Sequence, residues 1–344
     1  MAPRRSGQAA SVIVRNANIV TLNPRQPRAQ ALAIDEERII RVGSNNQIDE
    51  LRSDWTHTLD TRGMTVLPGF IDSHSHMFFG GVVAEAVDLA AARTIDDIVR
   101  LTSARAAKRP EGEWIRGYGF SLDRLAERRH PTSAEPDRAT TRHPIWMTSD
   151  SFHSSAANSL GFETIDLEPY NPGLERDADG EFTGAYVTDA ANVPARQRVF
   201  GFLTDADAAR MIRLMADAAA HKGITTVHAF EGSRMAGDRD FWVLLDVCDS
   251  LPIRVLPYYE TFELSEAANK KIRGLGGCGR CNLDGMPNTH TAALVEPYAK
   301  IRPGIAASCT THKRKLTRSS LKPTRVPFRW ECTRWAMLLS SSCC

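Results

Sequence analysis

The sequence of 344 residues is long enough for one large domain or two ordinary ones, because single hydrophobic cores stop growing beyond roughly 250–300 residues. Its 42% of apolar and 24% of charged residues exclude a disordered chain and a coiled coil, and its net charge of +2 favours no particular partner. No apolar run reaches the roughly 20 residues that span a bilayer, and the N-terminus lacks the apolar stretch of a secretory signal, so we expect a cytoplasmic protein with no membrane partner.

The first sixty residues predict several short strands. β-branched and apolar residues fill 11–21 and 31–42, and turn residues interrupt both segments near their middle. A further strand is predicted at 56–60. So few short strands bury little apolar surface alone, and we therefore expect residues 1–62 to form part of a small β-sandwich, a composite domain beside a larger one.

Residues 84–200 are expected to form a long insertion that consists mostly of loops. The exception is a helix that begins at Thr94, with a T-x-x-D capping pattern, and ends before Pro110. The segments 133–144 and 167–184 are rich in Pro, Gly, Asp and Thr, which are typical of turns and loops.

A helix is predicted after Thr204, where Asp207 completes a capping box and Gly223 follows the helix at a position that favours a left-handed residue. Its apolar face is expected to contain Ala208, Met211, Ile212, Met215, Ala218 and Ala219.

The next elements alternate between strand and helix. Strands are predicted at 224–230 and 253–259, with a helix at 241–249 between them. This alternation is typical of parallel strands that are connected by helical crossovers.

The strand-like run 66–76 ends in two histidines, His74 and His76. Side chains at i and i+2 of a strand face the same side, so both imidazoles can bind one metal ion at about 2.0–2.1 Å. In a barrel, the C-terminal end of such a strand opens where barrel enzymes place their sites. A bare His-x-His also occurs on surfaces by chance, but the preceding Pro-Gly-Phe-Ile-Asp favours the metal interpretation.

Segment 66–76 resembles the first metal-binding strand of the amidohydrolase superfamily. Further segments resemble, in family order, its branch called amidohydrolase 3 or the N-substituted formamide deformylase-like group, and they are 114–119, 129–146, 150–161, 223–228 and 283–285. This resemblance covers roughly residues 11–299 and implies an α/β fold, a (β/α)8 TIM-type barrel with a β-sandwich built from both chain ends. It also implies metal-assisted hydrolysis of C–N bonds other than peptide bonds, in small amide-type substrates such as amides or formamides.

The resemblance implies a divalent metal cofactor, Zn²⁺ as the first expectation, bound as one or two ions. His74 and His76 match the first pair of family ligands. Where many members carry a lysine four residues before the aspartate of Leu-Asp-Gly, this chain has Arg280, which cannot lose its proton and cannot bind a metal. We therefore name Cys281, as a thiolate, as the further metal ligand.

The chain changes character near residue 300. The segment 300–344 contains ten Lys or Arg residues and one acid, which gives it +9 and leaves −7 for residues 1–299. We expect a disordered basic tail without family resemblance, after a barrel domain at 63–299. No segment after Tyr298 resembles the family's later histidines or its aspartate, so the catalytic residue is unknown and we expect an incomplete barrel that could be inactive. An unpaired strand edge would favour self-association.

Five further residues are candidates for substrate binding: Trp114, Asp150, His153, His228 and Asp284. For most of these residues a purely structural role is an alternative to substrate binding. Trp114 could serve packing, His153 could be a solvent-facing loop residue, and Asp284 could bond its own backbone in a turn. His228 lies near the end of a predicted strand, where a barrel rim is expected, and its alternative is a hydrogen-bonded core histidine.

Two other classes of function remain open. A Cys₃His set could hold a structural zinc in a non-catalytic remnant, although the spacing between its two pairs exceeds that of zinc ribbons. Its members are Cys278, Cys281, Cys309 and His312. The basic run 313–315 could contact phosphates, but the charges around it follow no helical or strand face, so we do not expect nucleic-acid binding.

Overall fold

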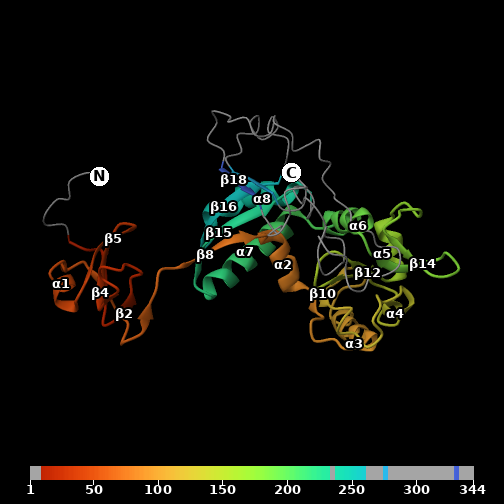
Figure 1. Cartoon of the computed structure of the whole chain (residues 1–344), viewed down its shortest axis with the longest axis horizontal. Coiled ribbons are helices and arrows are strands. Elements are labelled where there is room, and N and C mark those ends of the chain that lie inside the picture. The colour runs from red at the N-terminus through yellow and green to blue at the C-terminus, as the bar shows by residue number, and fades with distance from the viewer. Residues whose placement is uncertain (1–8, 233–236, 261–273, 278–328, 333–344) are drawn as a thin grey trace, which may run out of the picture. The chain divides into compact units, whose positions relative to one another are not determined.

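The computed structural model describes residues 9–232, 237–260, 274–277 and 329–332 (Figure 1). The chain divides into two compact units, Met1–Phe70 and Ile71–Cys344. In the described part of the chain, no helix combines the length and the apolar character that crossing a bilayer requires.

The first unit contains two small sheets, ordered β5-β4-β1-β6 and β3-β2-β7. Its elements are β1 (Val12–Arg15), β2 (Asn18–Val20), β3 (Arg28–Ala29), β4 (Ala31–Asp35), β5 (Arg38–Gly43), α1 (Asn45–Asp49), β6 (His57–Asp60) and β7 (Thr65–Val66). The predicted strands are confirmed, and Asn16 and Glu36 make the predicted turns with positive φ angles of 53° and 52°. Val14, Ile19 and Leu32 from both sheets share one apolar cluster. Whether these sheets are half of a larger sandwich stays a prediction.

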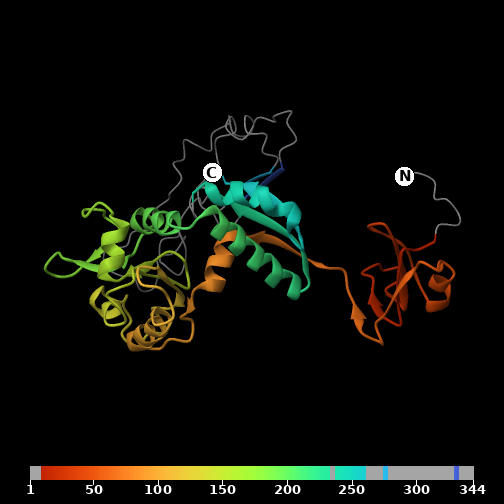
Figure 2. The same ribbon diagram turned by 180° about the vertical axis from the view of Figure 1, so that it is seen from behind.

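The second unit contains a five-stranded sheet in the order β18-β17-β16-β15-β8, with parallel pairing from β15 to β18. Its elements are β8 (Phe70–Ser75), α2 (Met77–Glu85), α7 (Asp205–His221), β15 (Ile224–Glu231), α8 (Arg239–Val247), the 3₁₀ helix η1 (Cys248–Ser250), β16 (Arg254–Tyr259), β17 (Gly274–Gly277) and β18 (Arg329–Cys332). Helix α7 packs against α2, α8 and β15 (Figures 1 and 2). The predicted alternation is confirmed, and the strands described here do not close into a barrel.

Local sequence accounts for α7. The Thr204 hydroxyl accepts the N–H of Asp207, and the Asp207 carboxylate accepts the N–H of Thr204, so the predicted capping box is confirmed. Gly223 ends the helix with a φ of 77°. The predicted apolar face is wrong at one position, since Ala216 is buried and Ala218 is exposed. Two residues along a helix rotate a side chain by about 200°, so both cannot face the core.

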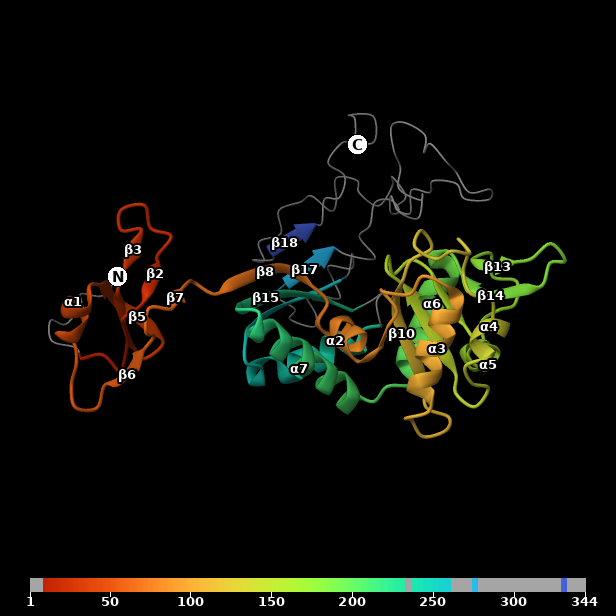
Figure 3. The ribbon, with the colours of Figure 1, turned by 90° about the horizontal axis from the view of Figure 1, so that it is seen from below.

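A second, six-stranded sheet in this unit follows the order β13-β14-β12-β11-β10-β9. With its helices it comprises β9 (Val87–Asp88), α3 (Ile95–Ala106), β10 (Ile115–Phe120), α4 (Ala134–Asp137), β11 (Ile145–Ser149), β12 (Ser155–Ala157), α5 (Ser159–Ile165), β13 (Leu174–Arg176), β14 (Phe182–Tyr186) and α6 (Asp189–Gly201). The helix predicted after Thr94 is confirmed as α3, which lies beside β10 (Figure 3). The expectation that the rest is mostly loop is confirmed for segments 133–144 and 167–184, which are mostly turns and loops, but it missed the six strands of this sheet. The strands are short, and β11 is buried along its whole length, so the alternation that marks a strand is missing.

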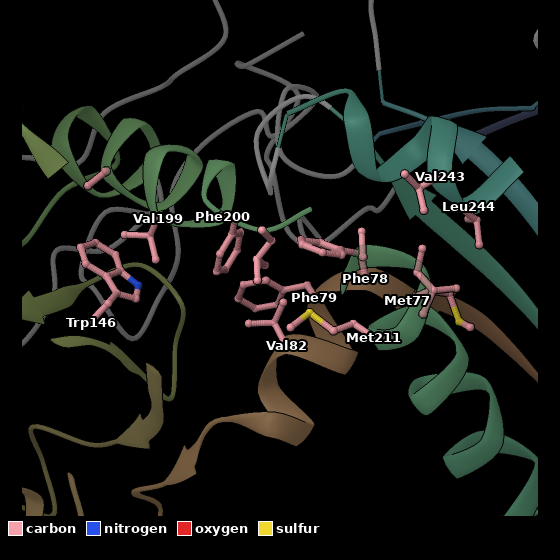
Figure 4. Close-up of a cluster of buried hydrophobic side chains, with 14 of the residues drawn as sticks. Met77, Phe78, Phe79, Val82, Trp146, Val199, Phe200, Met211, Val243 and Leu244 are labelled. Carbon is pink, nitrogen blue, oxygen red and sulfur yellow. The ribbon is translucent and has the colours of Figure 1, made fainter. Parts of the chain in front are cut away.

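One apolar core joins the two sheets of the second unit (Figure 4). Phe78 of α2 meets Phe200 of α6 edge to face, with ring centroids 5.7 Å apart. Gly81 lies so close to α7 that a Cβ there would approach the carbonyl oxygen of Met211 to 2.1 Å. Close packing of this kind fixes the position of α2, and therefore of the residues at its N-terminus.

Candidate functional site

The two histidines of the His-x-His motif lie together at the junction of β8 and α2. His74 belongs to β8, and His76 is the N-cap residue of α2. Their ring centroids are 5.2 Å apart and the ring planes are inclined by 87°. Two imidazoles that bind one metal ion at about 2.0–2.1 Å place their centroids about 5 Å apart. The separation in the structure therefore fits one shared ion.

The surroundings of His76 leave one of its ring nitrogens available to a metal. Its Nδ1 lies 2.6 Å from the backbone carbonyl oxygen of Phe230 in β15. A carbonyl oxygen only accepts, so Nδ1 carries the proton and Nε2 keeps its lone pair. Burial lowers the pKa of His76 to about 4, so its ring is neutral near pH 7, which is the form that binds metals.

His74 lies on a face of β8, β15 and β16 that is formed by stacked aromatic rings. The His74 ring stacks on Phe230 at 4.6 Å, and Phe230 stacks on Tyr258 at 4.9 Å. His228 stacks on the same tyrosine at 5.5 Å. Burial lowers the pKa of His74, and the nearby Asp72 carboxylate opposes that effect. The structure therefore brings His228 onto the sheet face that holds His74.

Glu231, the last residue of β15, ties this strand to the first turn of α2. Its side chain is fully buried, and its Oε1 accepts the N–H of Phe78 at 3.2 Å. Burial, followed by the charge of Asp240, raises the pKa of Glu231 well above its usual range. Burial likewise raises the pKa of Asp240 to about 7. Burial therefore favours the protonated form of Glu231 beside the residues that follow His76.

The loop after β11 carries Asp150 and His153. The Nδ1 of His153 lies 3.3 Å from the Oδ1 of Asp189, the first residue of α6. Asp150 is exposed and forms an ion pair with Arg124 at 3.3 Å. The ring of His153 is therefore oriented by a carboxylate, whereas the carboxylate of Asp150 is engaged with a neighbouring cation.

The backbone of the same loop is fixed to α6 and α2. The carbonyl oxygen of Phe152 accepts hydrogen bonds from Asn192 at 2.9 Å and from Arg196 at 3.2 Å. The Phe152 ring contacts Phe79 of α2, with centroids 4.6 Å apart. Burial lowers the pKa of His76 most, and the charges of His74 and then of Arg196 lower it further. Helix α6 thus connects the loop of His153 to the histidine pair.

Trp114 lies in a different environment. Its ring is 5.6 Å from that of Phe202, and both rings line a cavity whose lining includes neither His74 nor His76. The structure therefore does not bring Trp114 to the histidine face.

Several predicted residues lie outside the described residues: Cys281, Asp284, Cys278, Cys309 and His312. Within the described ranges, no group of three or more His, Cys, Asp or Glu side chains could hold a metal ion. His74 and His76 therefore form a pair whose geometry fits a metal, without a described third ligand.

Comparison with known proteins bears on this site. The sequence profile of the amidohydrolase family matches residues 57–319, a range that contains His74, His76, His153 and His228. The chain belongs to the amidohydrolase family. The match extends beyond residue 299, after which we expected no family resemblance.

Several proteins resemble this amidohydrolase chain over part of their length. It is 30% identical over 193 residues to N-substituted formamide deformylase of Arthrobacter pascens, which covers 54% of this chain and 36% of that protein. It is 26% identical over 315 residues to Protein LONG AFTER FAR-RED 3 of Arabidopsis thaliana, which covers 85% of this chain and 53% of that protein. The chain thus spans between about a third and about half of these curated relatives.

A solved structure shares the fold of this amidohydrolase chain. An uncharacterized metal-dependent hydrolase from Pyrococcus horikoshii superimposes with a TM-score of 0.70 at 22% identity, over 93% of this chain and 64% of that chain. This likeness, together with the parallel sheet, confirms the predicted α/β class.

Three residues around the histidine pair were not found from the sequence: Phe230, Glu231 and Arg196. The contact of Phe230 with His76 is made by a backbone carbonyl, so the residue type gives no indication of it. Only the fold places this carbonyl beside His76. Glu231 could have been suspected from the sequence, although weakly. It ends an apolar strand, and a carboxylate that is buried there needs a hydrogen-bond partner.

Proposed function

We propose that this chain is part of a metal-dependent hydrolase that acts on C–N bonds other than peptide bonds, in small amides or formamides. Family membership supports this proposal, as do the names of two proteins that it resembles, a formamide deformylase and a metal-dependent hydrolase. One observation of the structure carries it. The hydrogen bond between the Nδ1 of His76 and Phe230 leaves Nε2 bare, next to a second histidine at a metal-sharing distance.

In this proposal, His74 and His76 hold a divalent cation, Zn²⁺ as the first candidate, as one or two ions. When bound, such an ion lowers the pKa of its water to about 7 and polarises a substrate carbonyl. The Phe230 carbonyl holds the proton of His76 at Nδ1 and so fixes the ring orientation. Glu231 holds the start of α2 through the N–H of Phe78. Cys281 is proposed as a further ligand from the family resemblance alone.

Two described residues are proposed to face the substrate. The aromatic stack through Tyr258 connects His228 to His74, and Asp189 orients His153 on a loop that contacts α2. For Asp150 and Asp284, the same role rests on the resemblance, whereas Trp114 lines a cavity that does not include His74 or His76.

The proposal extends to the architecture. We infer that β8, β15, β16 and β17 are strands of an incomplete (β/α)8 barrel at 63–299, beside a partial sandwich at 1–62 and a basic tail at 300–344. The parallel order of β15, β16 and β17 supports this inference. A cytoplasmic location and self-association through a sheet edge stay predictions.

The test is hydrolysis of an N-alkylformamide and the matching acetamide by the purified chain, measured as amine release with added Zn²⁺ and after chelation. We expect metal-dependent release that falls roughly 100-fold or more in His76→Ala. His221→Ala is a matched control, since the Nδ1 of this exposed histidine lies 2.7 Å from a backbone carbonyl in α7. Hydrolysis that survives both chelation and His76→Ala would contradict the proposal.

A further inference from the structure

A cavity of about 840 Å³ lies between the end of α2, strand β10 and helices α5 and α7. Small-molecule sites in proteins have volumes of about 300–1,000 Å³. The histidine pair is not part of its lining, so what this cavity binds does not depend on the proposed metal site.

The lining contains three arginines and three acids, and they are not equally paired. Arg210 forms ion pairs with Glu85 and, at 3.3 Å, with Asp207. Arg109 pairs with Glu113 at 3.5 Å. All three acids of the lining are therefore engaged with a cation.

Arg116 in β10 is different. It forms no ion pair or hydrogen bond with any side chain or carbonyl in the described ranges, and its Nε is buried without an acceptor. Burial lowers the pKa of Arg116 to about 10, and the charge of Asp207 opposes this effect from beyond ion-pair distance. A guanidinium therefore stays charged near pH 7 in a site that offers it no direct counter-ion.

An apolar surface lies next to this cation. Trp114, which directly precedes β10 and lines the same cavity as Arg116, contacts Phe202 with ring centroids 5.6 Å apart. Pro144, Leu160, Leu203 and Met211 complete the apolar part of the lining. A ligand with an anionic group and a compact apolar body would match both features.

We propose that this cavity binds a small monocarboxylate with an aromatic or aliphatic body, its carboxylate on Arg116 and its body against Trp114 and Phe202. A planar guanidinium matches the geometry of a carboxylate. A single negative charge fits better than the two of a phosphate, because Glu85, Glu113 and Asp207 also line the space.

The test compares three probes on the full chain by calorimetry: 3-phenylpropionate, the neutral 3-phenyl-1-propanol and inorganic phosphate. We expect 3-phenylpropionate to bind at least about tenfold more tightly than the alcohol or phosphate. We expect Arg116→Met to lose at least about tenfold in affinity for the acid. Arg109→Met is the matched control, since this arginine lines the same cavity but is already paired with Glu113, and it should change affinity less than about threefold.

A second measurement needs no variant. Phenylglyoxal modifies accessible arginines, and peptide mass spectrometry reports each site. We expect 3-phenylpropionate, but not the alcohol, to slow the modification of Arg116 while leaving Arg109 unaffected. The proposal is overturned if the acid does not bind, if the alcohol or phosphate binds as well, or if Arg116 is not protected.

Discussion

The second unit has two halves, one around the five-stranded parallel sheet and one around the six-stranded sheet. The charged side chains inside these halves differ in their protonation and in their partners. Beside the parallel sheet, Glu231 and Asp240 are buried. Burial raises the pKa values of both carboxyls and so favours their neutral, protonated forms. Beside the six-stranded sheet, Arg116 keeps its charge, because a guanidinium with a pKa of about 10 is still protonated at pH 7. Within the described residues the Glu231 carboxyl accepts a backbone N–H, whereas the guanidinium of Arg116 has no counter-ion at ion-pair distance.

Buried glycines are closely packed in both halves. In the parallel-sheet half, a Cβ on Gly81 of α2 would meet the backbone of Met211 in α7, and in the other half a Cβ on Gly161 of α5 would approach the carbonyl oxygen of Ile145 to 2.6 Å. Gly201 at the end of α6 is exposed, and an added Cβ there has no neighbouring atom within 4 Å. The histidine pair thus rests on close-packed helices.

The largest effect is expected for Gly81→Ala. The new methyl would overlap the Met211 carbonyl, so α2 must move away from α7, at a cost of about 3 kcal/mol in the free energy of unfolding. Gly201→Ala is the matched control and should be neutral or slightly stabilising. Denaturant unfolding measures both, and equal effects would show that the contact between Gly81 and α7 does not fix the position of α2.

An intermediate effect is expected for Asp240→Asn. A carboxyl whose pKa is raised from 3.8 to about 7 on folding contributes stability below pH 4 that is lost as pH rises through 7. The wild type should therefore lose more than about 1 kcal/mol relative to Asp240→Asn between pH 4 and pH 8.

The matched control for this titration is Asp246→Asn, an exposed aspartate on the same helix. Thermal unfolding across this pH range reports the difference. A wild type and Asp240→Asn that change in parallel would show that Asp240 is not held protonated.

The smallest effect is expected for Arg116→Met without ligand. Arg116 is partly buried and has no ion pair within the described residues, so replacing it by an apolar side chain of similar length should raise the free energy of unfolding by about 1 kcal/mol. Arg210→Met, which leaves Glu85 and Asp207 without that partner, should lower it instead. Destabilisation by Arg116→Met would mean that this guanidinium has a stabilising partner inside the fold.

Features that depend on local sequence were predictable. Thr94 and Thr204 each cap a helix within three residues, and the turns at Asn16 and Glu36 are set by their own backbone angles. The helix and strand alternation after Thr204 follows from periodicity alone.

Features that depend on distant contacts were not predictable. In the six-stranded sheet, β11 and β12 are buried along their whole length, so they show no alternation that a sequence could reveal. The hydrogen bond from His76 to Phe230 joins residues 154 positions apart. The His-x-His spacing predicted two imidazoles on one side, but only the fold shows which nitrogen of His76 is free.

The most direct test of the central claim is metal content per chain. We expect the purified wild-type chain, reconstituted with Zn²⁺ and desalted, to retain one or two ions, and His74→Ala/His76→Ala to bind at least about tenfold more weakly in a chelator competition. The single control His221→Ala should retain wild-type affinity. A wild-type chain that retains no metal, or a double variant that binds as well as the wild type, would contradict the assignment of these two histidines as metal ligands.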